Sequence, residues 1–197
     1  MIEAAFDYDS MLAQARQMHP RLIGFCGAAG AGKTFAATHL ARCYGYSRVR
    51  FAGPLKSMLH ALGLTEAETD GAEKDKPCAL LGGKTPRHAM QTIGTEWGRQ
   101  HIDADLWVRA WERAAAQFLD AGFPVVVDDV RFANEASAIW SRGGILIRID
   151  RDTGGLVPCG AHASETQPLH FDRIIGNSGE PEEFMAALDA VVRVEPA

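Results

Sequence analysis

Runs of apolar residues alternate along this chain with segments whose apolar positions recur every three or four residues. The runs predict five buried strands, at residues 22–26, 47–52, 124–130, 145–149 and 173–176. The segments between them have the spacing of amphipathic helices. Strands that alternate with helices through short links are typical of a parallel sheet covered on both faces. The pattern therefore predicts an α/β fold with three layers.

Helix start and stop signals divide the intervening segments. Thr85 is expected to cap a helix whose first residue is Pro86, and Gly122 is expected to end the helix that begins at Asp103 or Asp105. The helices are expected at about 33–44, 54–62, 86–101, 105–121, 132–142 and 181–194. Residues 63–84 carry glycines, charges and Pro77 without a regular period, so they predict a surface excursion.

The ends of the chain and its loops complete the expected organisation. Residues 1–20 have loosely helical spacing up to Pro20 and predict an N-terminal extension, either packed on the domain or acting as a partner-binding arm. We find no internal repeat and no linker between two cores. We therefore expect one domain over residues 1–197, with a helical insertion at about 53–121 and a loop at about 151–169.

Composition narrows the classes of partner. The chain has 197 residues, 47% of them hydrophobic, a formal net charge of −5 and a pI near 5.8. An acidic balance disfavours stable binding to polymeric nucleic acid. The four cysteines are far apart, which disfavours a zinc site or a disulfide framework. Without a membrane-length apolar run or a basic signal peptide, we expect a cytoplasmic location.

The segment after the first predicted strand fits the phosphate-binding loop (Walker A) pattern G-x-x-x-x-G-K-[ST]. Small residues let backbone N–H groups surround a phosphate, and the following helix directs its positive end to the same place. Lys33 can reach the β- and γ-phosphates, and the Thr34 hydroxyl can ligate Mg²⁺. The expected ATP-binding residues are Gly27, Ala28, Ala29, Gly30, Ala31, Gly32, Lys33 and Thr34.

Two aspartates end the most apolar strand of the chain. Asp128 and Asp129 follow three consecutive valines, at the edge where an α/β sheet opens its ligand crevice. Because side chains alternate along a strand, only one of the two is expected to face the site and hold the Mg²⁺ shell. Arg131 follows at the same edge and can grip a phosphate with two hydrogen bonds.

Further candidates lie in the helical region and after the fourth strand. Arg87 and Arg99 offer the same phosphate chemistry as Arg131. Trp97 and Trp107 are either core residues or a stacking surface for a base. Residues 151–169 follow strand four and are either a plain connection or a lid that excludes water, with arginines at the base, Arg148 and Arg151, and with His162.

With these residues placed, the chain resembles the phage-type deoxynucleoside monophosphate kinases, within the P-loop nucleoside monophosphate kinases. The resemblance extends from about Leu22 to the C-terminus. It is carried by the segments GFCGAAGAGKT, FAGPLKSML, TPRHAMQTIGTEWGRQHIDADLWVRAW, VVVDDVRFANEA, GGILIRIDR, HASE and DRIIGNSG. The QTIGTEWGR and DVRFANEA segments are the specific ones, since the first segment is common to nucleotide-binding loops.

This resemblance implies a P-loop kinase fold and transfer of the γ-phosphoryl group of ATP, with Mg²⁺, to a deoxynucleoside 5′-monophosphate. It favours Asp129 over Asp128 for the metal and gives Lys33, Asp129, Arg131 and Arg151 the catalytic roles. By the same resemblance Asn177 lies near the ATP base, and the far end of the lid carries His162, Ser164 and Glu165. The monophosphate side is expected to contain Lys56, Arg87, Gln91, Trp97, Arg99, Trp107 and Arg131.

Two alternatives remain open at this stage. One is a P-loop kinase acting on another small acceptor or on modified bases in DNA. The other is a nucleotide-dependent switch that has no acceptor. The sequence also leaves open a homodimer, the preferred base, and the discrimination between deoxyribose and ribose.

Overall fold

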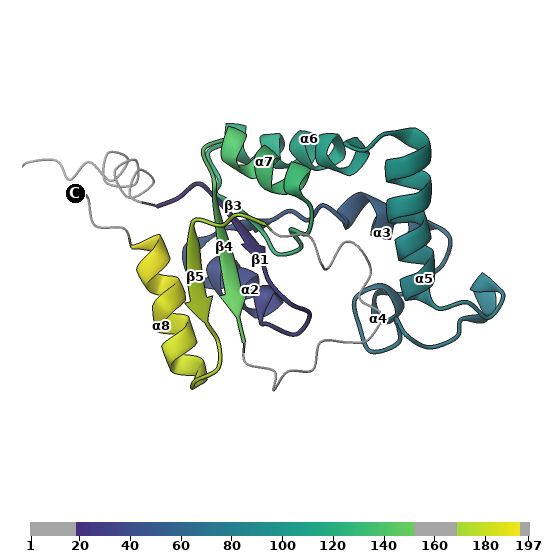
Figure 1. Cartoon of the computed structure of the whole chain (residues 1–197), viewed down its shortest axis with the longest axis horizontal. Coiled ribbons are helices and arrows are strands. Elements are labelled where there is room, and N and C mark those ends of the chain that lie inside the picture. Colours follow the sequence, from purple (N-terminus) through teal and green to yellow (C-terminus); the bar gives the residue numbers. More distant parts are fainter. Residues whose placement is uncertain (1–18, 152–168, 194–197) are drawn as a thin grey trace, which may run out of the picture. The chain divides into compact units, whose positions relative to one another are not determined.

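A computed structural model describes residues 19–151 and 169–193. It contains a five-stranded parallel sheet with the strand order β2-β3-β1-β4-β5. The strands are β1 Leu22–Cys26, β2 Ser47–Arg48, β3 Val125–Val127, β4 Ile145–Asp150 and β5 Arg173–Gly176 (Figure 1). Every residue of β1 and of β3 is buried, as their uninterrupted apolar sequences predict. The predicted α/β fold with a parallel five-stranded sheet is confirmed.

The chain divides into two compact units, and we describe each by itself. The first unit consists of Met1–Arg48 and Phe118–Ala197, and the second of Val49–Gln117. The first contains the whole sheet. The second has nearly the bounds of the helical insertion expected from the sequence. That this insertion belongs to one kinase domain stays a prediction.

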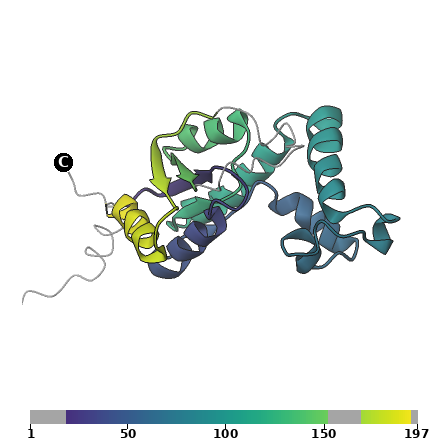
Figure 2. The ribbon, with the colours of Figure 1, turned by 60° about the horizontal axis from the view of Figure 1, so that its bottom comes forward.

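Helices cover both faces of the sheet in the first unit. Helices α2 (Lys33–Tyr44) and α8 (Pro181–Val192) lie side by side on one face, and α7 (Ala133–Ser141) lies on the other (Figure 2). Residues at alternate positions of the strands meet α2 and α8, among them Ile23 in β1 and Ile147 in β4. This arrangement gives the three layers that the alternating pattern predicts.

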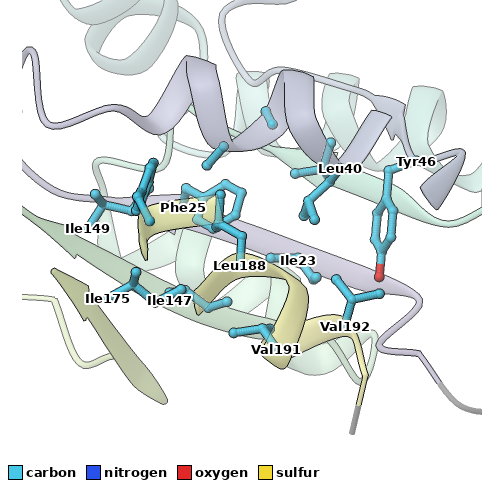
Figure 3. Packing of buried hydrophobic residues seen from close by; sticks show 14 of the residues in the cluster. Ile23, Phe25, Leu40, Tyr46, Ile147, Ile149, Ile175, Leu188, Val191 and Val192 are labelled. Carbon is cyan, nitrogen blue, oxygen red and sulfur yellow. The ribbon is translucent and has the colours of Figure 1, made fainter. Parts of the chain in front are cut away.

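The core beneath α2 and α8 consists of aliphatic side chains with three aromatic rings, those of Phe25, Tyr46 and Phe184. Leu188 of α8 and Leu40 of α2 are 1% exposed and point toward the strands (Figure 3). Fully burying one such side chain stabilises the fold by about 1.5–3 kcal/mol. The other labelled members of the cluster are Ile23, Phe25, Tyr46, Ile147, Ile149, Ile175, Val191 and Val192.

The second unit is helical. It contains α3 (Gly53–Ala61), α4 (Glu66–Thr69), the 3₁₀ turn η1 (Ala79–Leu81), α5 (Pro86–Gln91), the π-helix η2 (Thr92–Ile102) and most of α6 (Leu106–Asp120). A small apolar cluster joins α3 and α6, with Leu55, Leu59 and Trp107 among its buried members. Thr85 caps α5 by accepting a hydrogen bond from the His88 N–H at 3.1 Å, as the sequence predicts.

Several predicted boundaries differ from the structure. The second strand was expected over 47–52 but pairs only over Ser47–Arg48, because the chain leaves the sheet there for the second unit. The third was expected over 124–130 but pairs only over Val125–Val127. Residues 63–84 are more regular than expected, since they contain α4 and η1. The expected N-terminal helix lies outside the described residues.

The predicted helix 86–101 changes its winding after Gln91. Residues Thr92–Ile102 form a π-helix, and the Asp103 N–H donates to the Gly98 carbonyl, five residues back, at 2.9 Å. The Trp107 side chain binds this π-helix, because its indole N–H donates to the Gly94 carbonyl at 2.7 Å. A Cβ atom on Gly98 would lie only 2.6 Å from the same indole nitrogen. The glycines therefore let the Trp107 ring approach the helix backbone, which apolar periodicity alone does not indicate.

We expect Gly98→Ala to destabilise the second unit by about 1–3 kcal/mol, because the rigid Trp107 ring would have to move. Gly53→Ala is the matched control, since a Cβ there meets nothing within 4 Å and the site is the first turn of α3. Alanine at that position should be neutral or slightly stabilising. Thermal unfolding of both variants checks this, and equal midpoints would contradict the proposed role of Gly98.

Candidate active site

Two glycines determine the path of the loop between β1 and α2. Gly27 and Gly32 adopt φ values of 130° and 107°, a region that side chains disfavour. A Cβ atom on Gly27 would lie 2.3 Å from the Ile149 carbonyl oxygen, and one on Gly32 would lie 2.4 Å from Asn177 Nδ2. Glycine at both positions thus lets the loop lie directly against β4 and the residues after β5.

Lys33 begins α2 and lies over the loop. Its ammonium group donates to the Gly27 and Ala28 carbonyls, each at 2.7 Å. These contacts hold the charge at the mouth of the loop, next to the N-terminus of a 12-residue helix. A positive side chain and a positive helix end at one place favour an anion there.

Thr34 lies against a buried carboxylate. Its hydroxyl donates to Asp128 Oδ2 at 2.9 Å. Arg48, the last residue of β2, holds the same carboxylate through a fork: Nε donates to Oδ1 at 2.9 Å and Nη2 donates to Oδ2. Only 2% of the Asp128 side chain is exposed. A carboxylate so deeply buried needs such partners, because burial removes its hydration.

The alternation of the sheet explains why Asp128 meets Thr34. Val126 belongs to the core cluster on the α2 and α8 face, together with Ala36 of α2. Asp128 lies two residues after Val126, so it continues on the face that α2 covers. The sequence analysis had favoured Asp129 from the family resemblance. The geometry around Thr34 favours Asp128, and Asp129, which is half-buried, follows it at the strand end.

Asn177 braces the phosphate-binding loop. Its side-chain amide donates to the Ala31 carbonyl at 2.7 Å, and its backbone N–H donates to the Asp150 carbonyl at 2.7 Å. Together with the Gly32 approach described above, these bonds tie the loop to the ends of β4 and β5. The expected position of Asn177 near the ATP base stays a prediction.

Arg131 is exposed at the start of the turn into α7. The backbone there is held by the buried side chain of Glu135, whose Oε2 accepts from the Arg131 N–H at 2.7 Å and from the Phe132 N–H at 3.1 Å. Glu135 thus satisfies two N–H groups at the start of α7. It also fixes the backbone that presents the Arg131 side chain.

Cys26 precedes the loop but is not poised for thiol chemistry. Burial raises the pKa of its thiol to about 11, although Arg148 and Lys33 act in the opposite direction. A nucleophilic cysteine needs a lowered pKa. Cys26 is therefore a core residue at the end of β1.

In the second unit, two expected phosphate-binding cations are paired with carboxylates. Lys56 and Arg50 both bind Asp70, the latter at 2.6 Å. Burial would raise the pKa of Asp70, but the hydrogen bonds from Lys56 and Arg50 outweigh it and lower the pKa. Arg87 forks onto Asp75, with Nε to Oδ1 at 2.5 Å and Nη2 to Oδ2 at 3.1 Å. The hydrogen bond from Arg87 lowers the pKa of Asp75.

The remaining candidates of the second unit differ in exposure. Trp97 is 41% exposed and lies beside Trp107, with the ring centroids 6.3 Å apart. Trp107 is 4% exposed, and its N–H bond to Gly94 makes it part of the core of this unit. Arg99 donates to the Ala104 carbonyl at 3.0 Å, and Gln91 is half-buried at the end of α5. Of the two tryptophans, only Trp97 presents a large face to solvent.

Some expected residues cannot be placed, and others were missed. The expected lid, with His162, Ser164 and Glu165, lies outside the described residues, whereas Arg151 is exposed directly after β4. Sequence analysis did not identify Arg48, Arg50 or Glu135 as part of any site. A glutamate four residues after Arg131 is a helix-capping signal that could have identified Glu135.

No helix in the described ranges is long and apolar enough to cross a membrane. In the same ranges, no cluster of three or more His, Cys, Asp or Glu side chains could hold a metal ion. A site built from one carboxylate and one hydroxyl, completed by phosphate oxygens and water, would not form such a cluster.

Replacing Glu135 by alanine should destabilise the protein by about 1–3 kcal/mol, because two N–H groups at the start of α7 lose their acceptor. The control is Glu182→Ala, which removes an exposed acid from the first turn of α8 and should cost less than about 1 kcal/mol. Urea unfolding at neutral pH compares the two. Equal losses would mean that Glu135 has no special role.

The chain is similar to a viral protein over most of its length. A protein of Acanthamoeba polyphaga mimivirus, provisionally named a deoxynucleotide monophosphate kinase, is 33% identical over 187 residues, covering 87% of this chain and 95% of the relative. No model of a protein family matches the sequence.

Two solved structures are similar at lower identity. The first is a sugar kinase from Janibacter sp. HTCC2649, with 16% identity, a TM-score of 0.43, and 85% of this chain and 91% of the other covered. The second is TT1252 from Thermus thermophilus, with 17% identity, a TM-score of 0.45, and coverages of 88% and 96%. At these TM-scores we base no argument on either likeness. The mimivirus relative, together with a parallel sheet that carries a phosphate-binding loop, shows that the chain has the P-loop kinase fold and belongs to the deoxynucleotide monophosphate kinase family.

Proposed function

We propose that this kinase transfers the γ-phosphoryl group of ATP to a deoxynucleoside 5′-monophosphate and forms the diphosphate, a step in the supply of DNA precursors in the cytoplasm. The observation that carries the proposal is the contact between Thr34 and the buried Asp128 beside Lys33. This is the arrangement that a Mg²⁺–nucleotide complex requires. The mimivirus relative supports the class of acceptor.

The residues at the loop fit a magnesium ion. Thr34 and Asp128 supply the hard oxygen ligands that Mg²⁺ prefers, and phosphate oxygens and water complete such a shell. When bound, the ion neutralises charge on the phosphates. Asp128 would hold this shell directly or through water, and Asp129 is the second candidate for the same role.

Lys33 and the loop backbone act on the transferred group. Phosphoryl transfer depends mainly on position and charge, because little covalent chemistry is left to the protein. Lys33 is held at 2.7 Å by two weakly basic carbonyls and can exchange them for phosphate oxygens of higher charge. Arg131 and Arg151 supply further positive charge at the carboxyl edge of the sheet.

The acceptor phosphate is assigned to cations of the second unit. Lys56, Arg87 and Arg99 bind it in our proposal, and the exposed Trp97 offers a stacking surface for the base. The attacking oxygen belongs to a phosphate that is already anionic, so no general base is needed. Gln91 is polar and half-buried at the end of α5, the helix that also contains Arg87, and it can select among bases by hydrogen bonding.

Incubation with ATP, Mg²⁺ and each deoxynucleoside monophosphate in turn should release ADP faster with at least one acceptor than without any. Liquid chromatography of the nucleotides should show the matching diphosphate in equal amount. The ribonucleotides and base-modified deoxynucleotides are included to define the substrate range. The same slow ADP release with every acceptor would exclude the proposed reaction.

Alanine at Arg87, Arg99 or Arg131 should lower kcat/KM for the acceptor by about 10- to 100-fold, because each removes charged hydrogen bonds to phosphate. The control is Arg113→Ala, which removes an exposed arginine of α6 and should change kcat/KM little.

The second hypothesis is a nucleotide-dependent switch without an acceptor, which the loop alone would also support. It predicts that all four variants keep the same slow hydrolysis of ATP.

A further inference from the structure

Arg48 contacts both residues that would hold the metal ion of the proposed kinase, Thr34 and Asp128. Its Nη2 group bonds Asp128 Oδ2 and also lies 3.5 Å from Thr34 Oγ1. Those two oxygens are the atoms assigned above to the Mg²⁺ shell. A side-chain cation thus bridges the same carboxylate and hydroxyl that a divalent cation would use.

The hydrogen bonds at Thr34 make this overlap specific. A hydroxyl has one proton, and Thr34 donates it to Asp128 at 2.9 Å. Only lone pairs of the Thr34 oxygen remain for another partner, and Arg48 Nη2 faces this oxygen. A metal ion would need a lone pair of the same oxygen. Because a guanidinium and a divalent cation repel each other at contact distance, the binding of one at these oxygens disfavours the binding of the other.

We propose that Arg48 and the divalent cation compete for Thr34 and Asp128, so that Arg48 must release the carboxylate before the metal–nucleotide complex binds. This inference rests on the proposed function, which places the metal at these two residues. Arg48 is then a positioning residue that fixes the orientation of the Asp128 carboxylate. It also makes metal binding depend on the nucleotide, whose phosphates add the negative charge needed to displace the guanidinium.

The local structure allows Arg48, rather than Asp128, to move. The Arg48 side chain is 28% exposed, whereas that of Asp128 is 2% exposed. Arg48 ends a two-residue strand at the edge of the sheet, with only β3 as its neighbour. Asp128 directly follows β3, which pairs with β1 and β2. A rotation of the arginine side chain can therefore expose the carboxylate without any change in the sheet.

The test measures Mn²⁺ binding to the protein without nucleotide, by the loss of the free Mn²⁺ signal in electron paramagnetic resonance. Mn²⁺ suits the same oxygen ligands as Mg²⁺. Arg48→Met should bind Mn²⁺ at least about tenfold more tightly than wild type, because the competing charge is gone and a buried carboxylate is left without its counter-ion. Arg42→Met, which removes an exposed arginine from the last turn of α2, should match wild type.

Two further variants keep the proposal testable if Arg48→Met does not fold. Arg48→Lys keeps the charge but cannot form the fork, so it should fold and have intermediate Mn²⁺ affinity. The double variant Arg48→Met/Asp128→Asn removes both charges and should lose the gain in affinity. Mn²⁺ alone should also raise the unfolding temperature of Arg48→Met more than that of wild type.

The outcomes separate this inference from the proposed function. The proposed function stands if wild type binds Mn²⁺–ATP and Asp128→Asn weakens that binding. Competition is excluded if, in addition, the single variants Arg48→Met and Arg48→Lys bind free Mn²⁺ no better than wild type. If wild type binds ATP neither with nor without the metal, the proposed function fails first. Tighter Mn²⁺ binding that persists in the double variant would place the metal elsewhere and overturn the competition as well.

Discussion

The buried carboxylate of Asp128 is the constraint on which the site depends. A carboxylate this deeply buried is tolerated only with charged and hydrogen-bonded partners. Those partners come from β2 and from the start of α2, namely Arg48 and Thr34. The strand order β2-β3-β1 places both elements next to the end of β3. The candidate site therefore depends on this strand order, because the order brings the partners of the buried charge to it.

The phosphate-binding loop is supported from the other half of the sheet. Gly27 meets the backbone of β4, and Asn177, just after β5, binds the Ala31 carbonyl at 2.7 Å. The loop conformation thus depends on residues that are about 120–150 positions away in sequence. This long-range support explains how a run of glycines and alanines, which has high conformational entropy by itself, is held in one shape.

The charges of the second unit suggest how an anionic acceptor could be received at low cost. Lys56 and Arg87 each bind a carboxylate of the same unit, Asp70 and Asp75. The Arg87–Asp75 pair is exposed, and such pairs contribute little to stability, typically about 0–1 kcal/mol. In our proposal a phosphate of higher charge replaces the Asp75 carboxylate without a large penalty, whereas the Lys56–Asp70 pair is more deeply buried. Meanwhile the carboxylates keep the cations ordered and reduce their mutual repulsion.

The sequence alone determined the elements that have strong local signals. The bounds of β1 and α2, the cap of α5 by Thr85 and the phosphate-binding loop followed from apolar runs, helical spacing and glycines at defined positions. The segments that resemble the kinase family also pointed to the relative that comparison later found. These features depend on neighbouring residues, which a sequence displays directly.

Only the tertiary structure decided which side chains share the site. The contact of Thr34 and Arg48 with Asp128 joins residues 94 and 80 positions apart, and no local pattern specifies such a pair. Our proposal of Asp128 rather than Asp129 for the metal required knowing which face of β3 α2 covers. The π-helix likewise depended on the approach of the Trp107 ring to two glycines. Local periodicity sets the type of an element, whereas packing between distant elements selects the atoms that meet.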